Sequence, residues 1–389
     1  MKLIFFFVFR SILFPIMLLI SFIIYVRNWL YDKNILKSVR PDIFTINVGN
    51  LNLGGTGKTP HVEYLVRLLA DKYQVSILSR GYKRKTKGYI LADETATAES
   101  IGDEPMQYYL KFKDKINVVV CEDRVKGITP PQPFDPSNRP MGREQTTPPP
   151  TPPRWGGEFL RTLPIGEGRA TDASVGLFIL DDAFQHRRIK PHLNLLLCDY
   201  NRPFYEDSLV PFGRLRDLRS SAKRADAVIV TKCPKDISYQ KYKEIIAGMK
   251  TYVLPETPIF FSKIKYKTIT GYSPKNTFKF MQDVNVVTGI ANSDAFVEYI
   301  LAEKIRICEI HGFADHFAFS REKIDKILSN SKADKVNQII TTEKDMVKIK
   351  PLLTEAELKM FFYIPIQIEI EDKKGFDAFV LGRIENLTK

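Results

Sequence analysis

A glycine-rich segment carries the clearest chemistry in this sequence. An apolar run at 43–48 leads into it, and a helical pattern at 60–69 follows it. A strand, a turn and a helix in this order aim backbone N–H groups and the helix N-terminus at one point, where they favour a phosphate group. Lys58 would contact the β and γ phosphates of a nucleotide, and Thr59 would bind Mg²⁺. The predicted phosphate-binding residues are Asn52, Leu53, Gly54, Gly55, Thr56, Gly57, Lys58 and Thr59.

The first position of this loop departs from the strict G-x-x-x-x-G-K-[ST] pattern, because Asn52 stands where that pattern has glycine. Asparagine adopts left-handed backbone angles more readily than most residues do, so Asn52 is compatible with such a turn. An ordinary glycine-rich turn without a ligand is the alternative interpretation.

Two adjacent acids, Asp181 and Asp182, directly follow an apolar run at 177–180. In a phosphate-loop enzyme such a strand end supplies the metal-side acid, and one carboxylate can bind Mg²⁺ while its neighbour orients the site. Adjacent carboxylates repel each other, so the pair favours a nearby cation. A solvated turn at a strand end is the alternative.

Another pair of acids, Asp103 and Glu104, precedes a helical pattern. Taken alone, this position is better explained by capping of the helix N-terminus. His316 lies beside Asp315 after a further strand pattern, and such a histidine is more often a structural hydrogen-bonding group than a catalyst. A carboxylate hydrogen-bonded to a histidine is nevertheless what a general base for a hydroxyl needs.

Two basic loops offer cations for phosphate charge. Arg80 and Tyr82 lie in one loop, and Arg214 and Arg216 lie in the other. Guanidinium groups suit the stabilisation of phosphoryl transfer, whereas as isolated charges they would be solvated surface.

Composition limits the class of protein. The 389 residues suffice for one large or two modest domains, and 44% hydrophobic and 26% charged residues are ordinary globular values. The net charge of +13 indicates an anionic partner and leaves nucleic acid, acidic lipid and phosphorylated substrate open. The four cysteines are far apart, which is typical of reduced thiols in a cytosolic compartment.

Short β-rich runs alternate with helical patterns along the chain. One set of expected strands is followed by a second: 43–48, 75–78, 116–120, 177–180, 193–197 and 227–230, then 259–264, 284–289, 306–310, 338–341 and 361–364. This alternation predicts an α/β fold of the P-loop NTPase type, with a mostly parallel sheet flanked by helices and a second, smaller α/β lobe.

Two segments stand apart from this pattern. Residues 3–26 are almost wholly apolar and, as a helix of roughly 36 Å, would span a bilayer core. We expect an uncleaved membrane anchor, with an interfacial helix as the alternative because Arg10 and Pro15 interrupt the run. Residues 129–176 hold 11 of the 24 prolines and no lysine, so we interpret them as an insertion or a replaced segment without functional residues.

Taken together, the motifs and their order resemble the tetraacyldisaccharide 4′-kinases, the lipid A 4′-kinases of Gram-negative bacteria. The resemblance covers nearly the whole chain except 129–176. It is carried by the apolar N-terminus with Arg27-Asn28-Trp29-Leu30-Tyr31-Asp32, Asn47-Val48-Gly49-Asn50, the loop ending at Pro60, Ser79-Arg80-Gly81-Tyr82, Gly102-Asp103-Glu104-Pro105, Asp181 to Arg187, Gly213-Arg214-Leu215-Arg216, Asp315-His316 and Thr342-Glu343-Lys344-Asp345.

The resemblance implies ATP- and Mg²⁺-dependent phosphorylation of the 4′-hydroxyl of a tetraacylated glucosamine disaccharide 1-phosphate. The reaction would occur on the cytoplasmic face of the bacterial inner membrane, with membrane lipids as partners and no nucleic acid or protein partner. The implied domains are a membrane helix at 1–40, a P-loop kinase domain at 41–255 and a C-terminal α/β lobe at 256–389.

The resemblance also implies roles for individual residues. Asp103 looks like the base that activates the hydroxyl, with His316 as its partner and Glu104 in support. Lys58 and Arg216 would steady the transferring phosphoryl group, while Tyr82 carries over as a cofactor-binding residue and Arg124 as a further site residue. The implied Mg²⁺ ligands are Thr59, Asp182 and Gln185, with Asp181 adjacent.

The main rival is a membrane-associated partitioning or sorting ATPase of the deviant-Walker kind. Its loop begins K-G-G, and Leu53 occupies that lysine position here. A P-loop GTPase would need an N-K-x-D base reader, but Thr231-Lys232-Cys233-Pro234 follows the corresponding strand.

Overall fold

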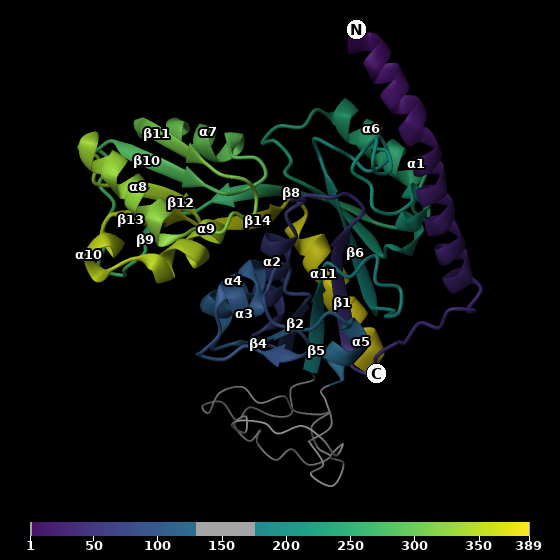
Figure 1. Cartoon of the computed structure of the whole chain (residues 1–389). Helices are drawn as coiled ribbons and strands as arrows, with labels where there is room; N and C mark the ends of the chain where they lie inside the picture. The colour runs from purple at the N-terminus through teal and green to yellow at the C-terminus, as the bar shows by residue number, and fades with distance from the viewer. Residues whose placement is uncertain (1, 130–175, 389) are drawn as a thin grey trace, which may run out of the picture.

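The computed structural model describes residues 2–129 and 176–388, so the proline-rich stretch predicted at 129–176 lies, apart from its two end residues, outside the described part. Two sheets organise this part of the chain (Figure 1). The larger has nine strands in the order β14-β8-β7-β6-β1-β5-β2-β4-β3, and the smaller has five in the order β11-β10-β12-β13-β9. The predicted α/β fold with a mostly parallel sheet and a second, smaller lobe is confirmed.

The larger sheet is parallel through its middle because crossover helices connect its strands. The strands are β1 Phe44–Asn50, β2 Gln74–Ser79, β3 Ile90–Leu91, β4 Ile116–Val120, β5 Gly176–Asp181, β6 Leu193–Asp199, β7 Ala227–Thr231, β8 Ile259–Tyr266 and β14 Ile366–Ile370. Central β1 is buried along its whole length and pairs in parallel with β5 and β6. Since Val48 lies opposite Asp181, the phosphate loop and the two acids leave the sheet at the same edge.

Helices cover both faces of this sheet. They are α2 Lys58–Leu69, α3 Ala98–Ile101, α4 Asp103–Phe112, α5 Arg124–Ile128, α6 Tyr239–Lys250 and α11 Lys373–Thr388, with the 3₁₀ turn η1 Arg219–Arg224. The apolar residues of α2 recur at helical spacing, so Val62, Leu65, Val66 and Leu69 are buried in the main core. This packing fixes the helix that begins at Lys58.

The second lobe repeats the same construction. It comprises β9 Thr270–Gly271, β10 Val284–Thr288, β11 Ile307–Gly312, β12 Ile339–Thr342 and β13 Phe361–Ile364, with α7 Asp294–Ala302, α8 Arg321–Ala333, α9 Glu343–Ile349, η2 Lys350–Leu352 and α10 Glu355–Leu358. Strands β10 to β13 pair in parallel, and β9 adds an antiparallel edge. Helix α9 of this lobe packs on α4 of the first.

The chain returns to the larger sheet after β13. Strand β14 pairs antiparallel with β8, with Ile366 opposite Tyr266. Helix α11 then buries Phe376, Val380 and Ile384 in the main core. Residues 256–389, expected as a C-terminal lobe, therefore contribute elements to both sheets.

Helix α1, Lys2–Asp32, lies along one edge of the molecule with its N-terminal end projecting beyond the body (Figure 1). Its segment Phe14–Asp32 is long and apolar enough to cross a membrane. Only 6% of its most apolar 18-residue stretch is buried, whereas the core helix of a globular domain is mostly buried. The C-terminal end of α1 is fixed to the body, because Asn28 donates to Asp217 at 2.9 Å and Arg187 pairs with Asp32 at 2.6 Å.

Candidate active site

The phosphate loop has the geometry that its glycines predict. Gly54 and Gly57 have φ angles of +105° and +84°, which a side chain would strain. Asn52, in contrast, is not among the residues with positive φ, so the tolerance of asparagine for left-handed angles is not used there. Its side chain donates to Asp207 at 2.8 Å and its carbonyl accepts from Asn50 at 2.8 Å. Hydrogen bonding, rather than backbone freedom, explains asparagine at this position.

His61, which sequence reasoning missed, holds the end of this loop. Its ring is buried, and burial lowers the pKa of His61 to about 4, so the ring is neutral at physiological pH. A carbonyl can only accept, so Nδ1 donates to the Gly57 carbonyl at 2.7 Å, and Nε2 accepts from the Ser262 hydroxyl at 3.0 Å. The histidine thereby connects the loop to strand β8.

Two cations converge on Asp182 beside the loop. Lys58 Nζ lies 3.7 Å from Asp182 Oδ2, and Arg216 contacts both carboxylate oxygens. Asn50 Oδ1 accepts from Arg216 at 2.5 Å and from Lys58 at 3.5 Å. Burial raises the pKa of Asp182, but Lys58 and Arg216 outweigh it and hold that pKa below its ordinary value. The carboxylate is therefore ionised and placed between two groups that could bind phosphate oxygens.

Asp181 has a different environment. Burial, followed by the charges of Asp182 and Glu104, raises the pKa of Asp181 to about 7. Its Oδ2 accepts from Tyr108 at 3.3 Å and Ser79 at 3.4 Å, whereas its buried Oδ1 has no hydrogen-bond partner. An unpaired buried carboxylate oxygen suits a cation.

The implied Mg²⁺ site fits these residues. Within the described residues, no group of three or more His, Cys, Asp or Glu side chains is arranged to hold a metal. Mg²⁺ normally takes only one or two protein carboxylates and completes its shell with phosphates and water. Asp181 and Asp182 meet that need, and Thr59 lies in the first turn of α2, next to Lys58, which pairs with Asp182. Gln185 also lies at the loop, where its amide donates to the Asn50 carbonyl at 2.7 Å.

The second pair of acids meets the histidine across the two lobes. Asp103 and Glu104 begin α4, and His316 lies in the loop between β11 and α8. His316 Nδ1 is 3.2 Å from Asp103 Oδ2, and Nε2 is 3.6 Å from Glu104 Oε1. Gly102 is the N-cap residue of α4, and no side chain caps the helix there. Asp103 instead contacts His316 in the other lobe, and helix capping does not explain that contact.

Tyr82 and Arg124 occupy contrasting positions. Tyr82 is 57% exposed, and its ring packs edge-on against His316 with centroids 5.3 Å apart. Arg124 is buried and donates to the Asp181 carbonyl at 2.9 Å, so it supports the backbone beneath the acids.

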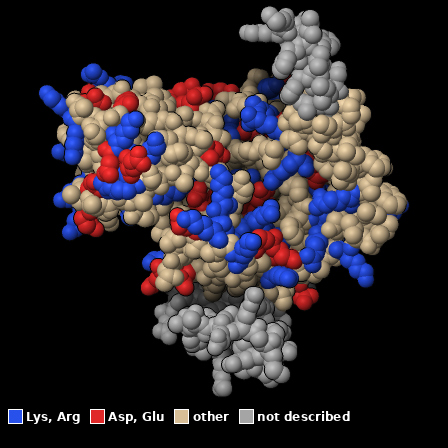
Figure 2. Space-filling view, viewed as in Figure 1, with Lys and Arg blue, Asp and Glu red and all other residues tan. Residues whose placement is uncertain are grey.

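Two lysines that sequence reasoning gave no role complete the interlobe cluster. Lys344 Nζ lies 3.1 Å from His316 Nε2, and Lys348 Nζ lies 3.9 Å from Asp103 Oδ2. Their spacing on α9 places both on one helix face, which is the signal that could have found them. Figure 2 shows basic side chains, with acids among them, gathered beside the seam between the lobes.

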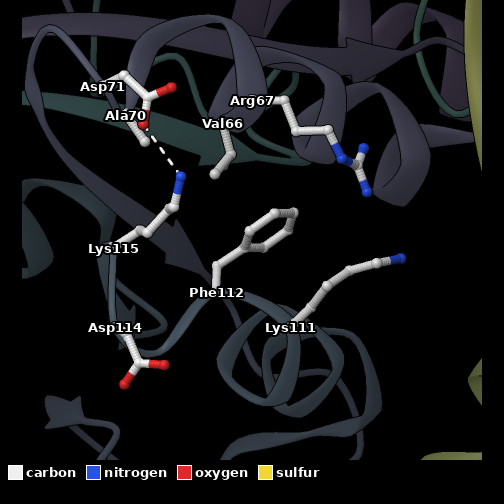
Figure 3. A pocket seen from close by; sticks show the side chains of 8 residues that line it. All are labelled: Val66, Arg67, Ala70, Asp71, Lys111, Phe112, Asp114 and Lys115. Atoms are coloured by element: carbon white, nitrogen blue, oxygen red, sulfur yellow. Dashed lines mark hydrogen bonds and ion pairs between the residues drawn. The ribbon is translucent and has the colours of Figure 1, made fainter.

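A separate cavity of about 420 Å³ lies between α2 and α4 (Figure 3). It is lined by Val66, Arg67, Ala70, Asp71, Lys111, Phe112, Asp114 and Lys115, and an ion pair of 3.0 Å joins Lys115 to Asp71. None of its lining residues belongs to the phosphate loop or to the acid clusters, so we place the reaction at the sheet edge instead.

A parallel sheet whose central strand feeds a glycine-rich loop, with strand-end acids beside the loop, defines a P-loop nucleotide-binding protein. Residues 9–131 and 166–385 match the LpxK family, tetraacyldisaccharide-1-P 4′-kinase. The chain belongs to this family and is a kinase. The break in the match, at 132–165, falls within the proline-rich stretch.

Individual relatives agree over nearly the whole chain. The tetraacyldisaccharide 4′-kinase of Cytophaga hutchinsonii is 37% identical over 386 residues and that of Flavobacterium johnsoniae is 38% identical over 383, covering 98% and 97% of this chain and 98% of each relative. The crystal structure of LpxK from Aquifex aeolicus in complex with ATP has a TM-score of 0.66 and 28% identity, covering 96% of this chain and 99% of that one. These matches do not favour the partitioning ATPase.

Proposed function

We propose that this kinase transfers the γ-phosphoryl group of ATP to the 4′-hydroxyl of a tetraacylated glucosamine disaccharide 1-phosphate. The family and the ATP complex of the Aquifex aeolicus relative support the reaction class. The observation that carries the assignment of residues is the meeting of Asp103 with His316 at 3.2 Å. Neither an ATP-driven sorting protein nor a lipid carrier needs such a base.

The nucleotide side of the site consists of the loop Asn52 to Thr59. Its backbone N–H groups and Lys58 would hold the β and γ phosphates, and Arg216 would neutralise charge as the phosphoryl group moves. Asp181, Asp182, Thr59 and Gln185 would hold Mg²⁺, which supplies further neutralisation of phosphate charge when bound. Because Lys58 and Arg216 contact Asp182, binding of the triphosphate requires that these cations redistribute between carboxylate and phosphate.

The acceptor side is formed by Asp103. Its carboxylate would take the proton of the 4′-hydroxyl as the oxygen attacks the γ-phosphorus, and the bond to the β-phosphate oxygen breaks to release ADP. His316 would hold that carboxylate in place, and Glu104 faces the other ring nitrogen of His316. Proximity and alignment supply much of the rate, because phosphoryl transfer needs little other covalent chemistry from the protein.

Helix α1 supports a membrane location for this reaction. Its exposed apolar side chains include Phe14, Leu18 and Phe22, and its fixed C-terminal end lies beside Gln185, whose carbonyl accepts from Arg27 at 2.6 Å. We infer that 1–40 anchors the enzyme in the inner membrane and that 41–255 and 256–389 work on its cytoplasmic face, where ATP is available.

The test is transfer of ³²P from ATP to the disaccharide lipid in detergent micelles. Asp103→Asn removes the base but keeps the shape of the side chain, so we expect turnover to fall by about 10²- to 10⁴-fold. The matched control is Asp114→Asn, which changes an exposed aspartate just beyond the other end of α4 and should leave turnover intact. Near wild-type turnover of Asp103→Asn would remove Asp103 from the role of base.

A further inference from the structure

Lys344 is positioned by the start of α9. Thr342 caps this helix, its hydroxyl accepting from the Asp345 N–H at 3.1 Å, and Lys344 follows in the first turn. Since α9 packs on α4, the lysine side chain lies in the seam between the lobes. Its Nζ contacts three groups there: His316 Nε2 at 3.1 Å, Asp315 Oδ1 at 3.0 Å and Glu104 Oε1 at 3.5 Å.

The charge of Lys344 is secure in this setting. Burial lowers the pKa of Lys344, but Glu104 and Asp315 outweigh that effect and hold the pKa above its ordinary value. The side chain is therefore an ammonium group near neutral pH. An ammonium group can donate hydrogen bonds but cannot accept them.

The contact with Lys344 consequently dictates where the His316 ring carries its proton. If Nε2 accepts from Lys344, the ring is neutral and its proton is on Nδ1, from which it is donated to Asp103 at 3.2 Å. Two carboxylates, Glu104 at 3.6 Å and Asp315 at 3.9 Å, also face Nε2. Both lie beyond ordinary hydrogen-bond distance from Nε2, and Lys344 pairs with each of them.

Resting on the proposed function for the identity of the reaction, we propose that Lys344 is a positioning residue that fixes His316 as the Nδ1–H tautomer, so that Asp103 alone receives the hydroxyl proton. With its Nε2 lone pair engaged, His316 cannot serve as the base. Its Nδ1–H occupies Asp103 Oδ2 and leaves Oδ1 for the acceptor hydroxyl. Lys348, at 3.9 Å from Oδ2, adds positive charge on the same side.

The backbone of His316 agrees with an imposed orientation. Its φ angle is +58°, in the left-handed region that a histidine seldom occupies. Such backbone is retained where surrounding contacts determine it, and here Lys344, Asp103 and the Tyr82 ring contact the side chain from three directions.

The tautomer can be measured directly in the full-length protein. The chain has five histidines, so ¹⁵N-histidine labelling in micelles gives a long-range ¹H–¹⁵N spectrum with few signals, and His316→Gln identifies the one required. We expect wild-type His316 to carry its proton on Nδ1. In Lys344→Met, Nε2 is free to take a proton toward Glu104, so the Nδ1–H form should lose its dominance and turnover should fall about 10- to 100-fold with the ATP KM within about twofold.

Two further variants separate this role from general lobe docking. Lys344→Arg also only donates, so it should keep the Nδ1–H tautomer and retain more turnover than Lys344→Met. Lys111→Met removes another ion pair between the lobes, the 2.6 Å contact with Glu343, together with a 2.8 Å pair to Glu63 within the first lobe, and it should leave the His316 tautomer unchanged.

A wild-type His316 protonated on Nε2 or on both nitrogens would overturn the inference, as would an unchanged tautomer in Lys344→Met. If Lys344→Met does not fold, the wild-type spectrum still decides by the position of the proton. Failure of this inference can be told apart from failure of the proposed function, because the tautomer is measured without turnover. A fully active Asp103→Asn variant would refute the role of Asp103 as the base, but it would not change the tautomer measured for His316.

Discussion

At the scale of single residues, Asp182 links the nucleotide cations to the metal side of the site. Lys58 and Arg216 both contact its carboxylate, and both are also the side chains expected to bind phosphate. If these residues act as proposed, the same carboxylate would oppose metal-free nucleotide and favour nucleotide that arrives with Mg²⁺.

Asp182→Asn should separate these two effects. Loss of the negative charge frees Lys58 and Arg216, so in EDTA the variant should bind ATP about tenfold more tightly than the wild type does. The increase in ATP affinity on adding Mg²⁺ should be smaller for the variant than for the wild type. Calorimetric titration with and without Mg²⁺ measures both. Asp199→Asn, which breaks a 2.7 Å pair with Lys232 at the end of β6, is the control; equal EDTA affinities for Asp182→Asn and wild type would contradict the expectation.

The spacing of residues within short segments predicted those site residues whose contacts lie in the same segment. The loop and the strand-end acids belong to short segments whose order along the chain already implies their geometry. His61 also contacts Ser262, and Lys344 contacts His316; both partners are far away in sequence, so local spacing does not predict these two contacts. The pairing of Asp103 with His316 was predicted through the family resemblance, since helix capping was the better explanation of Asp103 in isolation.

At the scale of elements, a polar layer joins α2, α4 and α9 near the interlobe cluster. Lys111 lies between Glu63 and Glu343, and Gln107 donates to Glu63 at 2.9 Å. Burial, followed by the charge of Glu63, raises the pKa of Glu343, because Lys111 only partly offsets them. Ionised Glu343 is thus less favourable in the folded protein than in the unfolded chain.

The raised pKa of Glu343 leads to a prediction about the pH dependence of stability. A raised carboxyl pKa in the folded state contributes stability below the unfolded value near 4.5, and that contribution is lost as pH rises through the folded pKa. The Glu343→Gln side chain cannot ionise. The free energy of unfolding of this variant, measured by urea titration, should therefore rise relative to that of the wild type as the pH increases from 4.5 to 8. Glu355→Gln, at an exposed site, should track the wild type, and parallel curves for Glu343→Gln would refute the assignment.

The sequence predicted the long buried strands better than the edge elements. The apolar run at 43–48 corresponds to buried β1, and the run at 284–289 corresponds to buried β10. The two-residue strands β3 and β9 have no pattern of their own, and β14 exists because β8 lies beside it. Pairing between distant segments, rather than local propensity, decides such strands.

At the scale of the whole molecule, α1 is the segment proposed to hold the body at the membrane. Deletion of residues 2–26 removes the exposed apolar helix but keeps Asn28 and its bond to Asp217. We expect sedimentation with vesicles of neutral and anionic phospholipids to fall at least about tenfold, since the apolar area supplies most of the binding. ATP binding should persist and serves as the test of folding.

The matched control for this deletion is Met281→Ala, which removes a fully exposed apolar side chain from the second lobe and should leave vesicle binding unchanged. Undiminished sedimentation of the deleted protein would instead assign the membrane contact to another surface.

The pairing of β8 with β14 has a mechanical consequence. The chain enters the second lobe after Tyr266 and leaves it at Ile366, and these residues are directly opposite each other. The smaller lobe is therefore held by a two-stranded ribbon rather than by a single flexible tether. Such a ribbon bends across its flat face more easily than it twists or stretches, so any swing that carries His316 toward or away from Asp103 would follow one preferred arc.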